Sequence, residues 1–185
     1  MSLVLHMRKW ARNNAWANYR LHQACLTLPI EEYHATRTGF FPSIAATLNH
    51  ILAVDHYYLD ALTGGGRGPT AFRAFVSFDV PLDLATAQAD CDKQLIAYCD
   101  GLTEAATAAL IKTDRGKSGV FLERCDDLLA HLFQHQMHHR GQVHNMLSGT
   151  SVTPPQLDDY FLSYDIAARG RDVEDIGLGG PETLS

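Results

Sequence analysis

The chain has 185 residues, of which 46% are apolar and 19% charged, an ordinary balance for one globular domain. Its formal net charge of −6 lacks the basic excess that binds phosphate, which argues against nucleic acid as the main partner. No stretch approaches the roughly 20 apolar residues that span a bilayer, and the N-terminal sequence has no secretory signal. We therefore expect a soluble, cytoplasmic protein with no membrane partner.

Helical periodicity predicts four long helices, over about residues 2–28, 43–63, 83–101 and 123–148. Pro29 stops the first helix, and Ser43 is a candidate N-cap for the second. The glycines at 64–66 end the second helix, and Asp83 is a candidate cap for the third. Because the helices follow one another without alternating strands, the pattern predicts an all-α, up-down four-helix bundle.

Shorter elements are expected between and after these helices. Residues 64–81 form a long loop with three phenylalanines, which we expect to pack against the bundle. Residues 111–113 and 120–122 suggest a small β-hairpin before the fourth helix. Pro154 and Pro155 suggest a short C-terminal helix over about 155–165. We expect a single domain over residues 1–168, and a tail over 169–185 that is rich in glycine and charge and is either loose or draped over the surface.

The fourth predicted helix contains an unusual group of histidines. Of ten histidines in the chain, four fall within nine residues: His131, His135, His138 and His139. At about 100° per residue, His135 and His139 lie about 40° apart on the apolar face of this helix. Two imidazoles four residues apart on one helix face can share a metal ion.

His50 lies on the inward face of the second predicted helix, within about 40° of Val54 and Ala61. An inward histidine on one helix and an inward pair on another can build a site between bundle helices. Buried imidazoles need polar partners, and a metal ion can accept one lone pair from each. The helical angles alone leave two interpretations open: one shared metal site, or three core histidines that are satisfied separately.

Several other residues are candidates for the surroundings of this site. His131 and His138 lie at the edge of the same apolar stripe, so the angles exclude neither from a cavity. Tyr57, about 20° from His50, could line the open side together with His138 and Gln142. A packing or rim position is the alternative for each. The sequence has no HExxH glutamate, so no catalytic residue is assigned.

Four segments of the chain are similar to the DinB family. They are WARNNAWANYRL, SIAATLNHILAVDHYYLDALTG, HLFQHQMHHRGQVHNMLS and PPQLDDYFL, and they span about residues 10–162. The HHRGQ stretch after an earlier histidine is the most specific of these features. The resemblance implies a four-helix bundle with one metal ion held by His50, His135 and His139. It also implies a homodimer.

The resemblance leaves the reaction open, because some relatives are thiol-dependent transferases or isomerases and many have no assigned activity. Three neutral nitrogen ligands leave a coordination position open, as in catalytic or ligand-binding metal sites. Zinc is our first choice and nickel the second. We expect a metal-dependent hydrolase or thiol transferase that acts on an unidentified small molecule, with a low-molecular-weight thiol as candidate cosubstrate. The alternative is a non-catalytic bundle protein that binds a metal or a small ligand.

Overall fold

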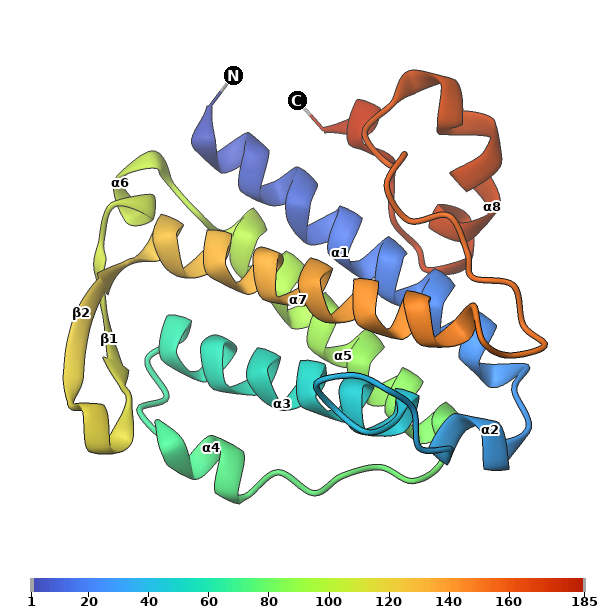
Figure 1. The fold of residues 1–185 in the computed structure, drawn as a ribbon. Helices are drawn as coiled ribbons and strands as arrows, with labels where there is room; N and C mark the ends of the chain where they lie inside the picture. Colours follow the sequence, from blue (N-terminus) through green and yellow to red (C-terminus); the bar gives the residue numbers. More distant parts are fainter. Residues whose placement is uncertain (1, 185) are drawn as a thin grey trace.

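The computed structural model describes residues 2–184 and contains the predicted four-helix bundle (Figure 1). The long helices are α1 (Leu3–Leu26), α3 (Ile44–Leu62), α5 (Pro81–Asp100) and α7 (Cys125–Leu147). Helix α1 packs against α5 and α7, and α3 packs against the same two helices. Helices α1 and α3 therefore occupy opposite corners of the bundle, and their apolar faces meet in one core. None of the helices between residues 2 and 184 is long and apolar enough to cross a membrane.

Helices α3 and α5 run in the same direction, opposite to α1 and α7, so the alternation expected of an up-down bundle is interrupted between these two helices (Figure 1). The connection over residues 63–80 must therefore return along the bundle, and it contains the short helix α4 (Pro69–Arg73). Asn49 fastens this connection to α3, because its side chain donates to the Phe78 carbonyl at 2.9 Å and accepts from the Phe78 amide at 2.8 Å. Phe75 and Phe78 pack against the core, so the expected packing of this loop is confirmed.

The helix ends follow local capping chemistry, with one departure from prediction. The Ser43 hydroxyl accepts from the Ala46 amide at 3.1 Å and caps α3, as predicted. Gly64 follows α3 with φ of 75°, a left-handed conformation that favours glycine. The predicted cap at Asp83 is wrong, because α5 already begins at Pro81. The fixed φ and missing amide hydrogen of proline suit the first helical position, which leaves Asp83 in the first turn.

A β-hairpin precedes α7, as predicted. Strands β1 (Leu110–Asp114) and β2 (Val120–Arg124) pair antiparallel, with Leu110 opposite Arg124 and Asp114 opposite Val120. A 3₁₀ turn at Gly116–Ser118 joins them. Two further short helices are α2 (Ile30–His34) and α6 (Glu104–Thr107). Because β2 leads directly into α7, the hairpin lies at the end of the bundle where α7 begins (Figure 1).

The C-terminal helix begins later than the sequence suggested. The predicted short C-terminal helix is present, but its predicted bounds of 155–165 are wrong, because the chain stays irregular from Pro155 to Leu162. After a 3₁₀ turn at Ser163–Asp165, α8 spans Ile166–Asp175, and a last 3₁₀ turn spans Pro181–Thr183.

Of the two expectations for the segment after residue 168, a loose tail is wrong, because the segment is folded against the bundle. Arg169 is only 1% exposed, and it donates to the Leu162 carbonyl at 2.8 Å and to Glu182 Oε2 at 2.5 Å. Its guanidinium also lies 5.5 Å from the ring centroid of Tyr160, which packs on Trp16 of α1. One buried arginine thus ties both sides of α8 together.

Candidate metal centre

Three histidines from two helices meet between α3 and α7. His50 projects from α3, and His135 and His139 project from successive turns of α7, with ring centroids 4.4–5.0 Å apart. One ring nitrogen of each lies within 4.8 Å of those of the other two. His50 Nε2 is 3.0 Å from His135 Nε2. The structure therefore brings together the three residues that the helical angles placed on inward faces.

Burial favours the neutral form of all three imidazoles. Burial, with a smaller effect of neighbouring histidines, lowers the pKa of His50 to about 4 and that of His135 to about 3. Burial also lowers the pKa of His139, although its hydrogen bond to Gln142 acts in the opposite direction. A neutral imidazole has one free lone pair, which is the form that ligates metal ions.

The donor set fits a divalent metal ion. Two nitrogens that each lie about 2.0–2.1 Å from a tetrahedral ion are roughly 3.3 Å apart, close to the separation of His50 and His135. Without an ion, these two Nε2 atoms can face each other favourably only if one of them carries the proton. The cluster consists of three histidines and contains no carboxylate among residues 2–184. Such a set leaves at least one coordination position open for a further ligand.

Gln142 orients His139 from behind. His139 Nδ1 lies 2.8 Å from Gln142 Oε1, so a proton on Nδ1 is donated to the amide oxygen and the lone pair remains on Nε2. The Gln142 amide in turn donates to Nε2 of His138 at 3.2 Å. His138 is exposed and lies outside the three-histidine cluster. The Nδ1 atom of His135, by contrast, is buried without a partner among residues 2–184.

A buried polar network fixes α7 behind the histidines. The Gln136 amide donates to Asp55 on α3, and Gln136 Oε1 accepts from Arg140 at 3.2 Å. Arg140 also donates to Asn14 Oδ1 at 2.5 Å and to Asn18 Oδ1 at 2.9 Å, both on α1. With Asp92 and Gln88 of α5, which bond to Asn18 and Asp55, the network joins all four long helices beside the two histidines of α7. It therefore sets the rotation of α7 that presents their rings to α3.

The charges of this network are balanced inside the core. Burial, reinforced by the nearby Asp92, raises the pKa of Asp55 to about 8. Burial raises the pKa of Asp92 only to about 6, because Asn18 and Gln88 donate to its carboxylate. At neutral pH one carboxylate therefore faces the Arg140 cation, and Asp55 carries a proton.

Comparison with known proteins identifies the family of this bundle. The sequence matches the DinB family model over residues 1–170. The chain belongs to the DinB family. The fold is similar to the crystal structure of a DinB-like protein from Bacillus cereus ATCC 10987, with a TM-score of 0.59 and 14% identity over 76% of this chain and 90% of that chain. No curated protein gives a significant match.

In this DinB family chain, a cleft of about 430 Å³ opens beside His135. Tyr57, one of the residues suggested by the sequence, lies in its wall and stacks on Phe72 with centroids 5.0 Å apart. The Tyr57 hydroxyl donates to the Asp114 carbonyl at 2.8 Å, which ties the wall to the hairpin. His131 also lines the cleft, with its ring centroid 6.4 Å from that of His135.

Two neighbours of the histidines were missed by the sequence analysis. Arg115 reaches the same cleft from the hairpin, where it donates to the Tyr58 hydroxyl at 2.8 Å and pairs with Glu123. Phe41 covers another side of the cluster, with its ring centroid 4.3 Å from that of His50. Both residues lie outside the long helices, where helical periodicity carries no information about direction.

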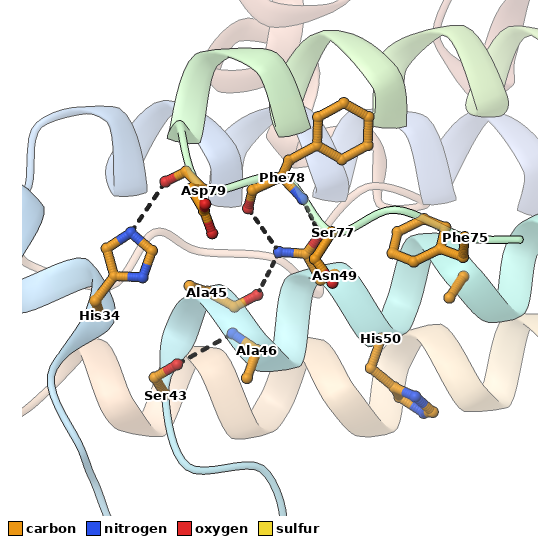
Figure 2. Close-up of a pocket in the computed structure, with 11 residues that line it drawn as sticks. His34, Ser43, Ala45, Ala46, Asn49, His50, Phe75, Ser77, Phe78 and Asp79 are labelled. Carbon is orange, nitrogen blue, oxygen red and sulfur yellow. Dashed lines mark hydrogen bonds between the residues drawn. The ribbon is translucent and has the colours of Figure 1, made fainter. Parts of the chain in front are cut away.

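A second pocket lies beside α3. Of the three clustered histidines, only His50 lines it. Figure 2 shows this pocket between α3 and the segment that Asn49 fastens at Phe78. The ring of His50 points away from the other labelled side chains (Figure 2). The cleft next to His135 is therefore the better candidate to receive a substrate of the three-histidine centre.

Proposed function

We propose that this DinB family protein is a metal-dependent enzyme in which His50, His135 and His139 hold one divalent ion. Zinc is the first candidate and nickel the second, because neutral imidazole ligands suit both ions. The observation that carries the proposal is the meeting of three neutral ring nitrogens beside an open cleft. A fully satisfied histidine core would give each ring a partner of its own, whereas His50 and His135 face each other.

The surroundings of the cluster suit a reaction on a small molecule. An ion held there would supply Lewis acidity that favours the deprotonated form of a water molecule or a thiol at neutral pH. Gln142 would keep the Nε2 lone pair of His139 directed at the ion. Phe41 would keep water from one side of the centre. The exposed ring of His131 would exchange a proton with the substrate in the cleft.

The substrate class follows from the cleft beside His135. Its aromatic wall, formed by Tyr57 and Phe72, would hold an apolar part of the substrate. Arg115 is already held by Tyr58 and Glu123, so it would fix the hairpin side of the mouth rather than bind a charge of the substrate. These features fit hydrolysis of a small ester or amide, or transfer of a low-molecular-weight thiol to a small electrophile.

Turnover assays test this proposal directly. The purified protein, loaded with zinc or nickel, is assayed with ester and amide panels and with thiol cosubstrates plus small electrophiles. We expect metal-dependent turnover that is lost in His139→Ala and retained in His144→Ala, which changes a histidine of the same helix outside the cluster. Stoichiometric metal binding without turnover across these panels would instead favour a non-catalytic binding protein.

A further inference from the structure

A separate cavity, distinct from the cleft beside His135 and from the pocket beside α3, lies between α1 and α5. Its volume is about 560 Å³, within the range of small-molecule sites. The C-terminal end of α8 and the residues after it close one side, so three separate parts of the chain contribute to its walls. The apolar wall consists of Ala15, Leu26, Leu82, Ala85, Ala89, Ile96, Ile176 and Leu178. Small alanine side chains on both helices leave this space open.

His22 lines this cavity and is the first sign that it takes a polar group. Its side chain is only 5% exposed, yet neither ring nitrogen is fully buried without a partner among residues 2–184, so the ring stays accessible at the cavity wall. Burial lowers the pKa of His22 to about 4, so the ring is neutral at physiological pH. A neutral imidazole offers one donor and one acceptor to a polar group that enters the cavity.

Gln88 supplies a second polar side chain in the same cavity lining. The residue is 1% exposed, and its amide nitrogen donates to Asp55 at 2.8 Å. Its Oε1 atom is buried without a partner among residues 2–184. Gln88 of α5 and His22 of α1 are thus neutral polar side chains of the lining that come from two different helices, and the His22 ring is the one with accessible nitrogens.

The charges around the cavity select against an anion. Asp92 lies in its lining, and its carboxylate is held by Asn18 rather than by a cation on this side. At the rim, Lys93 is already paired with Asp90 at 2.9 Å. Asp175 adds another carboxylate, which accepts from the Tyr19 hydroxyl at 3.1 Å. Three carboxylates against one lysine make an acidic surrounding that disfavours a negatively charged ligand.

We propose that the cavity between α1 and α5 is a binding site for a small, largely apolar molecule that carries a hydroxyl or amino group and no negative charge. The apolar body lies against the alanines and leucines, and the polar group reaches the His22 ring. This site is separate from the metal centre, because none of the three clustered histidines lies in its lining. It gives the protein a second ligand, independent of the activity proposed above.

Three probes that share one aromatic body test the ligand class. Naphthylmethanol, naphthylmethylamine and naphthoate are titrated into the full-length protein, and ring resonances of His22 and His50 are followed by NMR. We expect the alcohol and the amine to shift the His22 resonances and to bind at least tenfold more tightly than naphthoate. Preferential binding of naphthoate, shifts confined to His50, or absence of binding at millimolar probe would overturn the proposal.

Matched variants then locate the site. His22→Phe keeps the ring shape and removes both polar atoms, so naphthylmethanol affinity is expected to fall about tenfold, as for loss of one hydrogen bond. His6→Phe, on the exposed part of the same helix, should leave the affinity unchanged. Ala89→Trp should occlude the cavity, whereas Gln94→Trp lies on α5 outside the lining. Equal affinity in wild type, His22→Phe and Ala89→Trp would contradict the assignment, and circular dichroism confirms that each variant is folded.

Discussion

Gln142 determines which nitrogen of His139 faces the other two histidines. Replacement by leucine keeps the bulk of the side chain and removes the oxygen that accepts from His139 Nδ1. We predict that zinc affinity falls about 10- to 100-fold in Gln142→Leu, as is typical when the outer partner of a ligating histidine is lost. Competition titration with a chromogenic chelator measures this affinity. Gln134→Leu changes an exposed glutamine of the same helix and should bind zinc as wild type does. Equal zinc affinity in Gln134→Leu and Gln142→Leu would refute this role of Gln142.

His22 should impose a pH dependence on stability. Burial lowers the pKa of His22 to about 4 in the folded chain, whereas an unburied histidine in the unfolded chain has a pKa of 6.5. Between these two pH values the unfolded chain therefore binds a proton that the folded chain does not. The free energy of unfolding contributed by this group is therefore fully present above pH 6.5 and is lost as pH falls toward 4. We predict that wild type loses about 2–3 kcal/mol more than His22→Phe between pH 7 and pH 4.5.

Urea unfolding at several pH values measures this difference. His6→Phe serves as the control, since it removes an exposed histidine from the same helix and should keep the wild-type pH dependence. If His22→Phe and wild type lose the same free energy on acidification, His22 is not held neutral by burial.

Single residues were predictable where helical geometry governs their direction. The angles of His50, His135 and His139 placed all three on inward faces, and the structure brings them together. Those angles could not exclude His131 or His138, because both lie at the edge of the same apolar stripe. Phe41 and Arg115 could not be placed, because the path of a loop depends on tertiary contacts that no local pattern encodes.

The position of α7 depends on Arg140 at the scale of whole helices. This guanidinium joins α7 to Asn14 and Asn18 of α1, and it is the cation that balances Asp92 in the core. We predict that Arg140→Ala lowers the free energy of unfolding by about 3–5 kcal/mol, because the buried Asp92 carboxylate loses its countercharge and three amide oxygens lose their donor. The shift of the urea unfolding midpoint measures this loss.

A surface ion pair provides the contrast. Arg124 pairs with Asp126 at 2.6 Å where both helix and hairpin are exposed to solvent, so Arg124→Ala should leave the midpoint nearly unchanged. Similar losses in Arg124→Ala and Arg140→Ala would show that the buried network does not hold the helix in place.

Helix ends were predictable where the residue at the boundary strongly favours one position at a helix end. Ser43 and Gly64 fulfil the roles that their sequence positions suggested. Asp83 and Pro81 are both compatible with a helix start, and the proline at the first position decided the boundary. The polar composition after residue 168 concealed a folded segment, which is anchored by the long side chain of Arg169 and by the apolar contacts of Val173 and Ile176 with the cluster around Trp16.

At the scale of the whole molecule, the four-helix bundle was predictable from the sequence. The direction of the connection over residues 63–80 was not, because no local pattern determines it. Four amphipathic helices fix the bundle, and the DinB family match spans residues 1–170. The parallel arrangement of α3 and α5 arises from the long return over residues 63–80, which Asn49 holds against α3 (Figure 1). This arrangement leaves α3 and α7 antiparallel neighbours, and it places His50 opposite the two histidines of α7.

Metal content is the measurement that tests the central claim most directly. Protein refolded with equimolar zinc and then dialysed is examined by elemental analysis, for wild type, for the His50→Ala/His135→Ala double variant and for His144→Ala as control. The proposed centre predicts about one zinc per chain in wild type and in His144→Ala, and little zinc in the double variant. Equal zinc in wild type and a folded double variant, or no zinc in wild type, would contradict the three-histidine centre.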